Sequence, residues 1–80
     1  MNTIKTWRTE NLPAAAYIHG GRHLKFAGCV PSRPGLTSFI FEDPEDKGSD
    51  LEYAYDSGAT GVLSAFFSAI KFLRTQMTAV

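Results

Sequence analysis

The chain has 80 residues, 44% of them hydrophobic and 12% aromatic, and its eight basic side chains balance eight acidic ones. This composition is typical of a globular protein, so we expect one compact domain spanning residues 1–80 and exclude a disordered chain. The single cysteine, Cys29, excludes an internal disulfide and a zinc site built on paired cysteines, and the lack of a long apolar run or a signal-peptide pattern predicts a cytoplasmic protein without membrane contact.

The N-terminal segment predicts a short strand followed by a helix. From Thr3 to Thr9, β-branched and aromatic residues alternate with polar ones, which is typical of a strand. In the segment ENLPAAAYIHGG that follows, Thr9 or Asn11 can cap a helix, and Pro13 is tolerated in its first turn. The glycine pair at 20–21 is expected to end this helix.

Two strands are predicted next, joined into an antiparallel hairpin by the short loop Pro31–Gly35. The first strand covers residues 22–30, and the second covers residues 36–42 with Phe39 and Phe41 on one face. Strict alternation in the first strand gives two faces, one with Leu24, Phe26, Gly28 and Val30 and the other with His23, Lys25, Ala27 and Cys29.

A dense group of carboxylates follows the second of these strands, in the segment EDPEDKGSDLE. Pro44 cannot donate a hydrogen bond within a sheet, so the strand ends before it, and we expect the acids of Glu42–Asp46 to lie in a solvated loop. Ser49 and Glu52 have the spacing of a capping box, which predicts a helix up to Gly58. The acids lack the alternating pattern of a calcium loop, so no metal site is expected.

The segment from Gly61 to Met77 has the strongest helical periodicity. One broad apolar stripe is predicted from Val62, Leu63, Phe66, Phe67, Ile70, Leu73 and Met77, and the opposite polar side from Ser64, Ser68, Lys71 and Thr75. Phe72 falls outside the stripe. It marks either an exposed partner surface or a position beneath the loop that follows the hairpin. The fold is therefore predicted to be α+β, with a small antiparallel sheet of two or three strands packed by three helices in the order β-α-β-β-α-α.

The sequence offers weak candidates for chemistry. His19 and His23 are four residues apart, but the glycine pair interrupts the helix between them, and glycines that follow a helix lie at the wrong end to bind phosphate. Cys29 has no base beside it in the predicted strand, since His23 would lie about 20 Å away, so the thiol is not activated. We therefore predict no enzymatic activity, no metal, no cofactor and no small-molecule substrate.

The charges are unevenly divided along the chain. Residues 1–40 carry five basic side chains and one acidic one, whereas residues 41–80 carry three basic and seven acidic ones. Such a division is expected where two molecules meet basic face to acidic face, and also where loops and helix starts simply collect acids. A thin basic surface for nucleic acid, with aromatic residues interleaved, would be formed by Arg8, Arg22, Lys25 and Arg33.

Four motifs, WRTENLPAAAYIHGGRHLKF, SFIFEDPED, LEYAYDSG and FFSAIKFLR, together resemble a small domain family encoded by phages, prophages and bacteria. The matching positions include Ala15-Ala16-Tyr17, Phe39-Ile40-Phe41-Glu42-Asp43, Phe66, Ala69, Lys71, Leu73 and Arg74. Since the family has no assigned activity, the resemblance implies a phage context and no reaction. It also implies an anion-facing surface at Lys71 and Arg74, for which a solvated helix face is the alternative.

The leading functional prediction is a non-catalytic, phage-type accessory module that binds an unidentified protein, a second copy of itself included. Its predicted interface residues are Phe72, Lys71 and Arg74. The alternative is a weak nucleic-acid-binding protein that uses Arg8, Arg22, Lys25 and Arg33.

Overall fold

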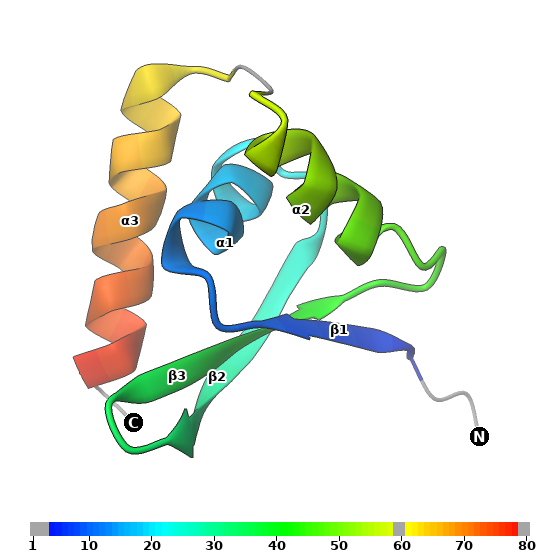
Figure 1. The fold of residues 1–80 in the computed structure, drawn as a ribbon. Helices are drawn as coiled ribbons and strands as arrows, with labels where there is room; N and C mark the ends of the chain where they lie inside the picture. Colours follow the sequence, from blue (N-terminus) through cyan, green and yellow to red (C-terminus); the bar gives the residue numbers. More distant parts are fainter. Residues whose placement is uncertain (1–3, 59–60, 79–80) are drawn as a thin grey trace.

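The computed structural model describes residues 4–58 and 61–78. Its elements are β1 (Thr6–Thr9), α1 (Leu12–Gly20), β2 (Lys25–Arg33), β3 (Leu36–Glu42), α2 (Gly48–Asp56) and α3 (Leu63–Thr78). The strands form one antiparallel sheet in the order β1-β3-β2, and Figure 1 shows the three helices grouped on one side of it. The predicted α+β class and element order are confirmed. The first strand begins at Thr6, later than predicted, and Thr3 lies outside the described residues.

The core lies between the central strand β3 and the helices. Phe39 and Phe41 of β3 are buried together with Ile18 of α1 and Leu73 of α3. The predicted placement of Phe39 and Phe41 on one face of β3 is therefore confirmed, and this face is the buried one. Three consecutive alanines in α1, residues 14–16, are also fully buried, and their small side chains let this helix lie close to its neighbours.

Small residues bring α1 and α3 into close contact. A Cβ added to Gly20 would lie 2.9 Å from the carbonyl oxygen of Ala65 and 3.4 Å from the Cβ of Ala69. The buried side of α3 is consequently centred on Ala69 and Leu73. The predicted stripe was wrong for Val62, Leu63 and Phe67, which are 69%, 65% and 55% exposed. Large side chains do not fit where two helix backbones approach this closely, so Leu63 and Phe67 are turned away from α1. Val62 lies just before α3 and borders a cavity beside α1, where it stays exposed.

A β-bulge at Ala27 changes the faces predicted for β2. Phe26 pairs with Phe41, whereas Gly28 pairs with the next residue of β3, so Ala27 is the extra residue. Beyond the bulge, Cys29 lies opposite Phe39 and packs against the core. The prediction that placed Cys29 on the face opposite to Phe26 was therefore wrong, because one inserted residue inverts the alternation that follows it.

The predicted β2–β3 hairpin is confirmed, with a tighter turn than expected. β2 begins at Lys25 and continues through Pro31 to Arg33, so Pro34 and Gly35 alone form the turn. A proline followed by a glycine at φ 80° is typical of a type II turn. Pro31 is tolerated inside β2 because β2 is an edge strand.

Asp43 joins three elements at the end of β3. Its carboxylate is buried and accepts hydrogen bonds of 2.7 Å from the backbone amides of both Lys47 and Gly48, at the start of α2. Its own amide donates to the carbonyl oxygen of Lys5, just before β1, at 2.8 Å. The prediction of a solvated acidic loop was therefore wrong for Asp43, whereas Glu45 and Asp46 are exposed as expected.

The predicted capping box of α2 was also wrong. The helix begins at Gly48, before Ser49, and its first amides are bound by the distant Asp43. Glu52 does not reach back to Ser49 but accepts a hydrogen bond of 2.7 Å from the hydroxyl group of Thr9. Asp43 and Thr9, which lie outside the helix, thus make the hydrogen bonds that the spacing of Ser49 and Glu52 led us to expect within it.

The helix α1 begins at its predicted cap, since the side chain of Asn11 accepts a hydrogen bond of 3.2 Å from the amide of Ala14. Its C-terminal end is a Schellman motif. The amide of His23 donates to the carbonyl of Ile18 at 3.0 Å, and that of Arg22 donates to His19 at 3.1 Å. The residue with positive φ in this motif is usually glycine, but here it is Arg22, at φ 56°.

Replacing Arg22 with glycine is expected to raise the free energy of unfolding by about 0.5–1 kcal/mol, because glycine adopts positive φ without steric cost. Urea unfolding of Arg22→Gly and the wild type measures this gain in stability. The slope of the free energy of unfolding against urea concentration should be the same for both proteins. Arg22→Ala removes the same charge but keeps the strain, so it should give no gain. Equal stabilities of the two variants would contradict the assignment of strain to this residue.

Candidate functional site

The structure separates the four basic residues that were expected to form a nucleic-acid surface. Arg8 on β1 and Lys25 on β2 lie at opposite edges of the sheet, because β3 lies between these strands. Arg33 lies at the far end of β2, about 25 Å from Lys25 at the usual strand rise. Arg33 is therefore not part of one surface with Arg22 and Lys25, whereas Arg8 lies on the same face of the sheet as Lys25, about 10 Å away across β3.

Arg33 is also engaged by a carboxylate. Its guanidinium group lies 2.9 Å from the carboxylate of Glu10, which accepts a further hydrogen bond from the hydroxyl group of Ser32. The hydrogen bond from Ser32 is the larger cause and that from Arg33 the next, and both lower the pKa of Glu10. This carboxyl group therefore stays ionised and offsets the charge of Arg33.

Arg22 and Lys25 lie together in a shallow open groove of about 590 Å³, between the end of α1, the start of β2 and the middle of α3. The groove is lined by His19, Arg22, Leu24, Lys25, Phe26 and Phe72, and we call it the Phe72 groove. The ring of Phe72 stacks on His19 with centroids 4.6 Å apart and contacts Phe26 edge-on at 5.4 Å. Phe72 is nevertheless 38% exposed, so part of its surface is open to a ligand.

Phe72 is exposed, as one of the two predicted alternatives requires, and the other alternative is wrong. It packs against α1 and the start of β2, and not beneath the loop that follows the hairpin. It is exposed only in part. The contact was not visible in the sequence because it depends on the rotation of α3, which Ala65 and Ala69 determine.

The Phe72 groove has a positive charge supplied by two side chains. Burial lowers the pKa of His19, so its ring is neutral at pH 7 and the cations are Arg22 and Lys25. Glu42 lies 3.7 Å from Lys25, but the lysine side chain is 78% exposed, so this pair is weak. The last carbonyl groups of α1 accept backbone hydrogen bonds from residues 21–23, which caps the negative end of the helix.

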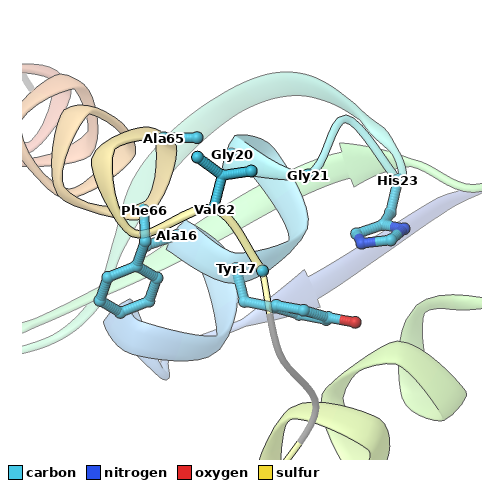
Figure 2. A pocket seen from close by; sticks show the side chains of 9 residues that line it. Ala16, Tyr17, Gly20, Gly21, His23, Val62, Ala65 and Phe66 are labelled. Atoms are coloured by element: carbon cyan, nitrogen blue, oxygen red, sulfur yellow. The ribbon is translucent and has the colours of Figure 1, made fainter.

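A second, smaller cavity lies between α1 and the start of α3. Figure 2 shows Tyr17, His23 and Phe66 around it, with Gly20 on α1 between them. Its volume is about 80 Å³, whereas pockets for drug-sized ligands measure roughly 300–1,000 Å³. The cavity has room for water or a very small molecule.

His19 and His23 contact different residues and do not form one site. His19 contacts Phe72 and Phe26, whereas the ring of His23 lies 5.0 Å from that of Tyr17. His23 does share a depression with the acidic loop, Glu42–Glu45, which the sequence did not indicate. Within residues 4–58 and 61–78, however, no group of three or more His, Cys, Asp or Glu side chains is arranged to hold a metal ion.

Cys29 lies in a non-reactive environment. Its side chain packs against the core beside Phe39, and burial raises the pKa of its thiol. A protonated thiol is a poor nucleophile.

The start of α3 carries an exposed apolar surface, formed by Leu63 and Phe67, which we call the apolar flank. Phe67 is one turn beyond Leu63, and Lys71 and Arg74 follow at four and seven residues from Phe67, on the same side of the helix. The sequence signal that could have identified this flank is the spacing of Ala65 and Ala69, which marks the side of α3 that approaches another helix.

The outer side of α2 has the opposite character. Asp50, Tyr53 and Asp56 recur every three residues and are all exposed. No basic residue occurs within α2, and no acidic residue occurs within α3. The two helices therefore present an acidic and a basic surface, each with exposed aromatic or apolar side chains.

Comparisons with models of protein families, with curated proteins and with solved structures find no match for this chain. The resemblance to a phage-encoded family therefore stays a prediction. In the described part of the chain, no helix is both long enough and apolar enough to cross a membrane.

Proposed function

We propose that the protein is a non-catalytic, phage-type accessory module that acts by binding protein, and that its partner is a second copy of this chain. The main support is the exposure of the apolar flank, where two large side chains, Leu63 and Phe67, face away from the protein's own core. Adjacent exposed apolar residues of this size are typical of protein-binding surfaces, whereas single ones are common everywhere.

Charge complementarity favours a second copy as the partner. The apolar flank is followed by Lys71 and Arg74 on α3, and the outer side of α2 carries Asp50 and Asp56 around Tyr53. A two-fold axis would place α3 of each copy against α2 of the other, so that both contacts form twice. Tyr53 would then cover the apolar residues while the acids meet the basic residues.

The predicted interface is thereby changed in one position. Lys71 and Arg74 are retained, because they are exposed on the side of α3 that carries the apolar flank. Phe72 is not, since it packs against His19 and Phe26 on another side of the helix.

Catalysis is not part of this proposal. The small size of the enclosed cavity, the protonated thiol of Cys29 and the separation of His19 from His23 all support a binding role. We also place the protein in the cytoplasm, which suits its single free thiol.

Phe67→Glu is expected to abolish self-association, because a carboxylate would be buried in the interface beside apolar groups and the acidic side of α2. The measurement is sedimentation equilibrium of both proteins across a wide concentration range. The wild-type protein should be a dimer that dissociates as salt is raised, and the variant should be a monomer with an unchanged circular dichroism spectrum.

The matched control is Gln76→Glu, which adds the same charge on the side of α3 opposite Phe67. It should dimerise like the wild type. A wild-type protein that is monomeric at the highest concentration, or a Gln76→Glu variant as impaired as Phe67→Glu, would refute the proposed interface.

A second candidate function, nucleic-acid binding, is supported by one observation. Arg22 and Lys25 share a groove with a partly exposed aromatic ring, Phe72.

A further inference from the structure

The Phe72 groove combines two kinds of chemistry that are often used together. Arg22 and Lys25 supply positive charge, and Phe72 supplies an aromatic surface between α3 and the start of β2. Phosphate groups are bound by such cations, and nucleic-acid bases stack on aromatic rings. The three side chains come from α3, from the start of β2 and from the residues that follow α1.

The backbone of Arg22 has an unfavourable conformation. Its φ of 56° is one that glycine adopts freely and that other residues rarely adopt. Strained residues of this kind are concentrated at binding sites. The strained residue is also one of the two cations of the groove, which indicates that its side chain serves a purpose other than stability.

We propose that the Phe72 groove binds single-stranded nucleic acid, with one base stacked on the exposed part of Phe72 and the neighbouring phosphates bound by Arg22 and Lys25. A base can stack on a side chain only when it is not stacked within a duplex, which favours a single strand. This assignment rests on the second candidate function and names its surface. It does not depend on self-association, because the apolar flank contributes no residue to the groove.

The test is fluorescence anisotropy with a labelled oligothymidylate of about eight nucleotides, a length within the range of small single-strand sites. Binding should be saturable at low salt and should weaken as salt is raised. A strand of the same length without bases retains the phosphates but offers nothing to stack, so it should bind at least about fivefold more weakly. An equal affinity for both strands would show a site for phosphate alone and would overturn the assignment.

Two variants test the groove itself. Arg22→Gly should weaken binding and reduce the slope of log K against log salt by about 0.7, the contribution of one phosphate contact to a single strand. Because the same change should increase stability, weaker binding could not be attributed to unfolding. Phe72→Leu keeps an apolar side chain against His19 and Phe26 but removes the ring, and it should weaken binding by about five- to 150-fold.

The matched control is Arg33→Ala, which removes the same charge at the far end of β2 and should bind like the wild type. Absence of wild-type binding at low salt would overturn both the second candidate function and the groove. Wild-type binding that Arg33→Ala reduces, and that Arg22→Gly and Phe72→Leu leave unchanged, would overturn the groove alone.

Discussion

Replacing Asp43 with alanine is expected to lower the free energy of unfolding by about 2–4 kcal/mol. The substitution leaves the backbone amides of Lys47 and Gly48 without their acceptor, and Gly48 is buried. A buried donor without a partner loses its hydrogen bonds to water and gains none within the protein. It also removes a negative charge from the positive end of the α2 dipole. Urea unfolding followed by circular dichroism measures the loss.

Glu45→Ala is the matched control, because it removes the same charge from the same loop at an exposed position. Its ion pair with Lys47, at 3.4 Å, is exposed and should contribute less than about 0.5 kcal/mol. Asp43→Asn keeps an acceptor oxygen but loses the charge, and should be intermediate. Similar stabilities for Asp43→Ala and Glu45→Ala would show that the cap contributes little.

Gly48→Ala is expected to destabilise the protein by about 1–3 kcal/mol, although alanine is the better helix former. A Cβ at this position would overlap the indole ring of Trp7 on β1, so the ring or the start of α2 must move. Urea unfolding followed by the fluorescence of Trp7, which is the single tryptophan of the chain, measures both the loss of stability and the displacement of the ring.

Gly61→Ala provides the control, since within residues 4–58 and 61–78 no atom outside the adjacent residues lies within 4 Å of the Cβ that it would add. Its stability should be that of the wild type. If the overlap with Trp7 is the cause, Gly48→Ala should cost less in a Trp7→Leu background, because the smaller side chain leaves room. An equal cost in both backgrounds would contradict this explanation.

Features that depend on neighbouring residues could be predicted from the sequence. The order of the six elements follows from local signals, such as the Pro34-Gly35 turn and the helical periodicity after Gly61. The placement of Phe39 and Phe41 on one face of β3 follows from their alternation. Each of these requires only the spacing of residues within one element.

Features that depend on contacts between elements were missed for physical reasons. The capping box at Ser49 is a sound local pattern, but the carboxylate of Asp43 already occupies the amides at the start of α2. Hydrophobicity placed Phe67 in the stripe of α3, whereas the close approach of Gly20 to Ala65 determines which side is buried. Packing overrode the pattern in both cases.

The candidate sites were predictable in the same limited sense. Arg22 and Lys25 are close in sequence, so their proximity needed little structural information. Phe72 lies beside these two residues only because α3 packs against α1 and β2. Arg33 forms an ion pair with Glu10, which lies far from it in the sequence, and this contact could not be predicted. The sequence could therefore identify candidate residues, but it could not predict which of them lie together in the folded protein.

The irregular shape of β2 has a consequence for how copies of this protein can meet. β2 forms one edge of the sheet, yet Pro31 lacks an amide to donate, and two register shifts interrupt the ladder, at Phe26/Gly28 and at Pro31/Arg33. A strand with these defects is a poor template for a strand from another molecule, so growth of the sheet into fibres is disfavoured along this edge. Contacts between copies are thereby directed away from this edge, and a contact through the helices can stop at a closed pair.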